Sequence, residues 1–151
     1  MTEKYIWTNC NYKLMSGKWK IGILLEAGYQ ILESLENKEG CVKLTDRICF
    51  QNMLYPYPRS QSLTHEELEY FCCGLKLMGE QIEKSLQKDS CLKIALRSIQ
   101  FTDCDIQKEA FTASAIQWSS ETFHFPMPHI SVEFDDSKGR NGMYLFDFSR
   151  L

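Results

Sequence analysis

Hydrophobic residues along this chain recur with the period of a helix in some segments and with the period of a strand in others. The clearest helical segment follows Thr64, whose side chain can cap the backbone amide of Glu67 while the Glu67 carboxylate caps Thr64 in return. Apolar residues then recur every three or four positions, at Leu68, Phe71, Cys72, Leu75, Met78, Ile82 and Leu86. This pattern predicts an amphipathic helix over residues 64–88. Gly74 and Gly79 lower its stability, and we expect another backbone to pack closely beside them.

In the segment that ends before Gly40, hydrophobic residues recur with the helical period in one part and with the strand period in another. Over residues 26–37 the apolar side chains recur at helical spacing, which predicts a helix there. Upstream, apolar residues also alternate as they would in a strand, at Trp19, Ile21, Ile23 and Leu25. Gly22 weakens a helix by about 1 kcal/mol. We favour one long helix from about residue 18, with a strand over residues 18–25 as the alternative.

Alternating apolar and polar residues predict strands in the rest of the chain. These strands span residues 5–8, 42–50, 91–101, 130–135 and 144–148. In the third of them the alternation changes parity at Ile99, which indicates a bulge. Asn141-Gly142 is a strong hairpin-turn signal and predicts that the last two strands form a hairpin. A further helix is predicted from about Asp105 to Trp118, with Thr102 or Asp103 as its cap.

The order of these elements is approximately β-α-β-α-β-α-β-β. It predicts an α+β fold with about three helices packed on a mainly antiparallel or mixed sheet. The chain has 151 residues, which is the usual size of one domain, and no repeat or flexible linker divides it. We therefore expect residues 1–151 to form a single domain.

Composition and cysteine usage restrict the class of protein further. Aromatic residues make up 13% of the chain, too many for a disordered protein, and a net charge of −3 is not that of a basic DNA-binding domain. The amino terminus lacks a signal-peptide pattern, and no apolar run is long enough to span a membrane. Seven cysteines, an odd number, do not suggest a disulfide framework. These features predict a soluble cytoplasmic protein with reduced thiols.

Motifs for catalysis or cofactor binding are absent from the sequence. It contains no nucleotide-binding glycine loop, no GxSxG elbow, no HExxH pair and no CxxC pair. Cys72 and Cys73 are adjacent, so on a helix their side chains point about 100° apart and do not share a metal readily. We expect no cofactor, no metal and no enzymatic activity. The alternatives are a small cytosolic enzyme that uses a cysteine or histidine in a cleft, and an adaptor module.

The distribution of charge suggests a binding surface for a basic protein. Residues 103–136 contain seven acidic residues and one basic residue, Lys108. This segment therefore has a net charge of −6, and the rest of the chain has a net charge of +3. We select six of the acids as candidate partner-binding residues: Asp103, Asp105, Glu109, Glu133, Asp135 and Asp136. An acidic surface attracts a basic partner over long distances. The alternative interpretation is that these acids form an ordinary solvated surface, cap helices and occupy turns.

A tyrosine–proline loop offers a second candidate surface. Tyr55, Tyr57 and Arg59 are of the residue types enriched in binding hot spots, and the intervening prolines reduce the entropy lost on docking. Packing of the two tyrosines over a sheet edge explains the same pattern.

In its general organisation the chain resembles small cytoplasmic immunity proteins of bacterial toxin–immunity systems, including contact-dependent growth inhibition. The most suggestive stretch is the strand-to-helix segment over residues 99–109, with its D-x-Q-x-E sequence, followed by Trp118 and a terminal aromatic hairpin. The resemblance implies stoichiometric binding that neutralises a toxin domain by blocking its active site or substrate cleft. A nuclease best suits an acidic binder. No direct binding of nucleic acid or membrane is implied.

Overall fold

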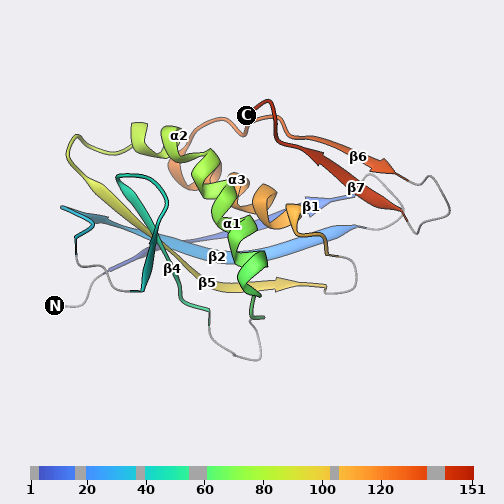
Figure 1. Cartoon of the computed structure of the whole chain (residues 1–151), viewed down its shortest axis with the longest axis horizontal. Helices are drawn as coiled ribbons and strands as arrows, with labels where there is room; N and C mark the ends of the chain where they lie inside the picture. Colours follow the sequence, from blue (N-terminus) through green and yellow to red (C-terminus); the bar gives the residue numbers. More distant parts are fainter. Residues whose placement is uncertain (1–3, 16–19, 37–39, 55–60, 103–105, 136–141) are drawn as a thin grey trace.

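The computed structural model describes residues 4–15, 20–36, 40–54, 61–102, 106–135 and 142–151. A five-stranded sheet in the order β1-β2-β5-β4-β3 forms its centre, and β6 and β7 pair in a separate two-stranded sheet (Figure 1). The strands are β1 (Ile6–Leu14), β2 (Ile21–Leu32), β3 (Cys41–Lys43), β4 (Ile48–Asn52), β5 (Cys91–Phe101), β6 (Ser131–Asp135) and β7 (Met143–Asp147). The helices are α1 (His65–Leu77), α2 (Gly79–Lys84) and α3 (Glu109–Phe123). The predicted α+β fold with three helices on a mixed sheet is confirmed.

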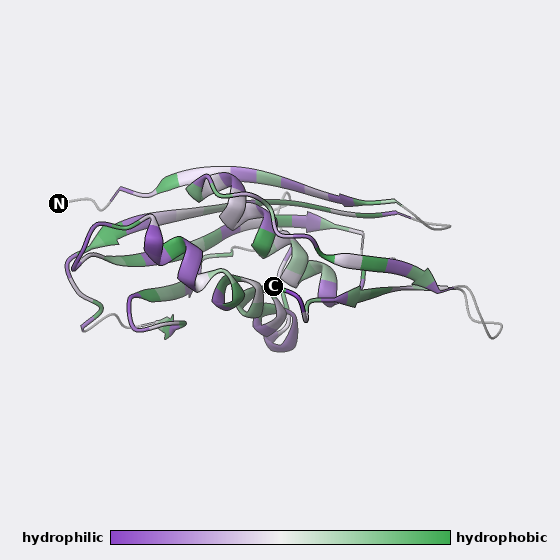
Figure 2. Ribbon diagram, turned by 90° about the horizontal axis from the view of Figure 1, so that it is seen from above, coloured by the Kyte–Doolittle hydropathy of each residue, from purple (hydrophilic) through white to green (hydrophobic). Residues whose placement is uncertain are grey.

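The central sheet is mixed because one of its strand pairs is parallel. β4 and β5 run parallel, and α1 and α2 form the crossover between them, whereas the β1–β2, β2–β5 and β3–β4 pairs are antiparallel. Parallel neighbours require such a crossover, and helices usually supply it. Apolar and polar residues alternate along the strands in Figure 2. No helix within the described ranges is long and apolar enough to cross a membrane.

The long helix predicted from about residue 18 is wrong, because residues 21–32 form strand β2. The strand alternative for its first half is correct. Ile21, Ile23 and Leu25 are almost completely buried on one face of the sheet, and β2 pairs with β1 on one edge and β5 on the other. Two neighbouring strands satisfy the backbone of β2, so pairing overrides the helical spacing of its side chains. Ile31, which contributed to that helical spacing, is 62% exposed.

The predicted strand over residues 42–50 is two strands, β3 and β4, joined by a tight turn. The Leu44 amide donates to the Ile48 carbonyl at 2.8 Å, which reverses the chain between them. The first strand of the protein is longer than predicted and reaches Leu14. Helix α3 begins and ends later than predicted, because its N-cap is Lys108 and it continues to Phe123, so Thr102 does not cap it.

The capping box at the start of α1 is confirmed. The Glu67 amide donates to Thr64 Oγ1 at 3.1 Å, and the Thr64 amide donates to the Glu67 carboxylate at 2.8 Å. The predicted helix over residues 64–88 is divided at Met78 into α1 and α2. Gly74 is placed as expected, because a Cβ there would collide with the Thr112 carbonyl of α3.

Helix α3 packs against α1 and against strands β1 and β2, and it is buried on most sides. Trp118 of α3 is completely buried, and its indole Nε1 donates to the Thr8 carbonyl of β1 at 3.3 Å. On the other side Thr112 Oγ1 donates to the Tyr70 carbonyl of α1 at 2.7 Å. The core is therefore one cluster that includes residues of β1, β2, β4, β5 and β7, with β6 packed against it.

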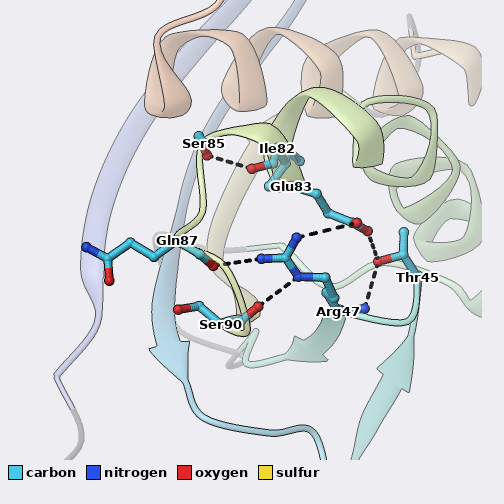
Figure 3. Close-up of polar contacts among 7 residues, drawn as sticks. All are labelled: Thr45, Arg47, Ile82, Glu83, Ser85, Gln87 and Ser90. Carbon is cyan, nitrogen blue, oxygen red and sulfur yellow. Dashed lines mark hydrogen bonds and ion pairs between the residues drawn. The ribbon is translucent and has the colours of Figure 1, made fainter.

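Arg47, in the turn between β3 and β4, ties this hairpin to the segment that enters β5 (Figure 3). Its guanidinium donates to the Ser90 and Gln87 carbonyls, each at 2.9 Å, and lies 4.0 Å from the Glu83 carboxylate. Thr45 Oγ1 donates to the same carboxylate at 2.6 Å. These contacts fix the end of α2 and the short loop that follows it.

The bulge predicted in β5 is confirmed, and the extra residue is Arg97. Glu26 pairs with Ser98 and Ala27 with Leu96, so no residue of β2 opposes Arg97. The Arg97 guanidinium donates to the Glu26 carboxylate at 2.8 Å and lies 4.0 Å from the centre of the Trp7 ring.

Candidate functional site

The β6–β7 hairpin has an apolar face directed at the core and a polar face directed away from it. Val132 pairs with Phe146 and Phe134 with Tyr144, and all four pack against the core. Tyr144 is 1% exposed, and its ring lies 5.1 Å from the ring of Phe134. The predicted hairpin is confirmed. Asn141 of the predicted turn lies outside the described residues, and Gly142 adopts a φ of +88°.

The opposite face of the hairpin, which we call the acidic hairpin face, carries three carboxylates around two apolar side chains. Alternation along the two paired strands places six residues there: Ser131, Glu133, Asp135, Met143, Leu145 and Asp147. Leu145 is 45% exposed and stands opposite the exposed Glu133. An exposed leucine among carboxylates can serve as an apolar anchor for a partner whose surrounding residues are basic.

A glutamine fixes the hairpin to the start of α3. Gln107 Nε2 donates to the Tyr144 carbonyl at 2.8 Å, and Gln107 Oε1 accepts from the Tyr144 amide at 2.7 Å. The side-chain amide thus pairs with the edge of β7 in the way that another strand would. These two hydrogen bonds give the acidic hairpin face a fixed position relative to the rest of the protein.

The structure brings together two of the acids selected from the sequence, Glu133 and Asp135. Glu109 lies in the first turn of α3, half-buried, where a carboxylate suits the helix dipole. The other candidates lie outside the described residues: Asp103, Asp105, Asp136, Tyr55, Tyr57 and Arg59.

Sequence reasoning missed Asp147 as a member of this face. Its carboxylate accepts hydrogen bonds from the Ser149 hydroxyl at 2.6 Å and the Ser149 amide at 2.9 Å. These bonds lower the pKa of Asp147, with a smaller contribution from Arg150, so the carboxylate stays charged at neutral pH. Strand alternation could have identified Asp147, because it lies two residues after Leu145 and therefore on the same face of the strand. The acidic segment defined from the sequence, however, ended at residue 136.

The buried thiols are poorly suited to nucleophilic catalysis. Burial raises the pKa of Cys10 to about 12 and that of Cys72 to about 11. A thiol acts as a nucleophile in its ionised form, and such pKa values keep both thiols protonated at neutral pH. The six cysteines within the described ranges are free thiols.

A small cavity of about 140 Å³ at one end of the hairpin combines serine, histidine and aspartate. It is lined by His129, Ser131, Asp147 and Arg150. In a catalytic triad the histidine links the serine to the aspartate by hydrogen bonds. Here the Asp147 carboxylate instead accepts hydrogen bonds from the Ser149 amide and hydroxyl. In the part of the chain that the structure describes, no group of three or more histidine, cysteine or acidic side chains is arranged to hold a metal ion.

No known protein-family model matches this sequence. No curated protein matches it significantly.

Proposed function

We propose that this protein is an immunity protein, which binds a cognate bacterial toxin domain and blocks its active site or substrate cleft. The observation that carries this proposal is the acidic hairpin face, where the exposed Leu145 lies beside Glu133, Asp135 and Asp147. Additional support is the resemblance of the chain's organisation to small immunity proteins.

The chemistry of this face suits a basic partner. Charged groups at the edge of an interface accelerate association by long-range attraction, and a buried apolar anchor slows dissociation. Enzymes that act on nucleic acids carry basic clefts that bind the phosphate backbone. A nuclease domain is therefore the toxin class that fits best.

The direct test is co-purification with the C-terminal domain encoded by the adjacent open reading frame, combined with growth rescue in cells that express this domain. We expect a stoichiometric complex and restored growth. Failure to form the complex, together with a turnover activity that one cysteine or histidine substitution abolishes, would contradict the proposal and favour a small enzyme. A complex that does not restore growth would favour an adaptor.

Variants of the acidic hairpin face test where the toxin binds. Glu133→Lys combined with Asp135→Lys should reduce the association rate constant about tenfold or more at low salt and weaken its salt dependence. Leu145→Ala should instead increase the dissociation rate constant. Glu36→Lys combined with Glu80→Lys is the matched control, since both acids are exposed, lie outside the hairpin and give the same change in net charge. If all these variants bind as the native protein does, the interface lies elsewhere.

A further inference from the structure

A groove between α1 and the β3–β4 hairpin forms a second concave surface, separate from the acidic hairpin face. Its volume is about 370 Å³, within the range of small-ligand sites. The uncharged residues that line the groove include Val42, Phe50, Leu68 and Cys72. We call it the α1 groove.

The floor of the α1 groove is apolar and uncharged. Phe50 is 1% exposed and its ring lies 5.8 Å from the ring of Phe71, so this part of the floor is held firmly by the core. Burial keeps the Cys72 thiol protonated at neutral pH, with a pKa of about 11. Val42 in the wall is 53% exposed, a large fraction for an apolar side chain in a strand. An apolar ligand would remove this surface from water.

The charges along the groove are arranged asymmetrically. At one end His65 Nε2 lies 3.0 Å from the Glu69 carboxylate, and the two groups neutralise each other when the histidine is protonated. At the other end the Lys76 ammonium lines the groove without an ion-pair partner among the described residues. Glu69 and Lys76 are separated by seven positions, or about 10 Å along the helix. A ligand anion at Lys76 is therefore two helical turns away from the Glu69 carboxylate.

We infer that the α1 groove binds a small molecule with one apolar chain and one carboxylate group. The chain covers Val42, Phe50 and Leu68, and the carboxylate lies against the Lys76 ammonium. The volume of the groove suits such a molecule better than a folded partner, and Lys76, which has no ion-pair partner among the described residues, selects an anionic head group over a cationic one. This site is independent of toxin binding.

The test uses octanoate as the probe, with octylamine and octanol as ligands of the same chain length and different head-group charge. Titrations are followed by the amide chemical shifts of the full-length protein. We expect saturable shifts at Val42, Leu68 and Lys76, with a dissociation constant on the order of 1 mM or below for octanoate. Octylamine should bind about three- to tenfold more weakly.

Charge reversal makes the test specific. Lys76→Glu should reverse the preference, so that octylamine binds more tightly than octanoate. Lys13→Glu is the control, because Lys13 is an exposed lysine on β1, at the opposite edge of the sheet. Equal affinities for the three ligands in the native protein, or an unchanged preference in Lys76→Glu, would overturn the assignment of a carboxylate. An absence of saturable shifts in the groove would overturn the site itself.

Discussion

At the scale of single residues, close contacts decide which glycines are essential. Gly28 of β2 lies beneath the Trp7 side chain, and a Cβ there would come within 2.6 Å of the Trp7 ring and 2.9 Å of the Ile6 carbonyl. Because the ring also stacks on Tyr5 and contacts Arg97, it has little room to move. Gly28→Ala should lower the free energy of unfolding by about 1–3 kcal/mol.

Urea denaturation followed by tryptophan fluorescence measures this loss. The matched control is Gly22→Ala in the same strand, where no atom lies within 4 Å of the added methyl group. That variant should be neutral or up to about 1 kcal/mol more stable. Equal effects of the two substitutions would show that the Trp7 contact is unimportant.

The buried thiols give the protein a pH dependence of known sign. Burial raises the pKa of Cys72 and Cys10 from about 9 in the unfolded chain to about 11 and 12, so above pH 9 the unfolded state releases protons that the folded state retains. The stabilising contribution is thus fully present below pH 9 and is lost as the pH rises from 9 to about 11 for Cys72 and about 12 for Cys10. Urea midpoints at pH 7 and pH 11 measure it, and a variant with alanine at both positions should lose part of the difference.

Alkylation tests the state of the same thiols. In denaturant without reductant, all seven cysteines should be modified, since we expect no disulfides. In the folded protein, among the six cysteines that the structure describes, the exposed Cys73 should react first and the buried Cys10 and Cys72 much later. Fewer than seven modifications in denaturant would indicate a disulfide or a bound metal.

At the scale of secondary-structure elements, the position of the hairpin depends on Gln107. Its side chain makes two hydrogen bonds to the backbone of Tyr144. Gln107→Ala leaves that edge of β7 without these partners and should cost about 1–3 kcal/mol. Hydrogen exchange of β6 and β7 should therefore accelerate, while α1 keeps its protection.

Gln117→Ala is the corresponding control. Gln117 also donates to a strand backbone, at the Asn11 carbonyl, but this carbonyl belongs to β1 and not to β7. If amide hydrogen exchange in β6 and β7 is as slow in Gln107→Ala as in this control, Gln107 does not hold the hairpin in position.

At the scale of the whole molecule, the continuous core predicts one cooperative unfolding transition. Core residues come from β1, β2, β4, β5 and β7, β6 packs against them, and the buried Trp118 connects α3 to β1. Far-ultraviolet circular dichroism and tryptophan fluorescence should therefore give the same denaturation midpoint. Two separate midpoints would contradict the expectation that residues 1–151 form a single domain.

The amino-acid sequence by itself determined the elements whose signals are local. The capping box at Thr64 and Glu67, the helical stripe from Leu68 and the alternation on either side of Gly142 each define an element without reference to distant residues. The alternation also placed Glu133 on the face of the hairpin opposite the core. These signals were sufficient at these elements because capping and side-chain periodicity depend only on neighbours in the chain.

Tertiary structure decided the features that depend on partners distant in sequence. The segment from Ile21 to Leu32 satisfies both periods, and it became a strand because β1 and β5 pair with its two edges. The pairing of β6 with β7 places Asp147 and Glu133 on one face of the hairpin. The packing of α1 near β3 places Val42 and Lys76 in the lining of the same groove. Backbone groups of a buried segment must find hydrogen-bond partners, and the global fold determines which partners are present.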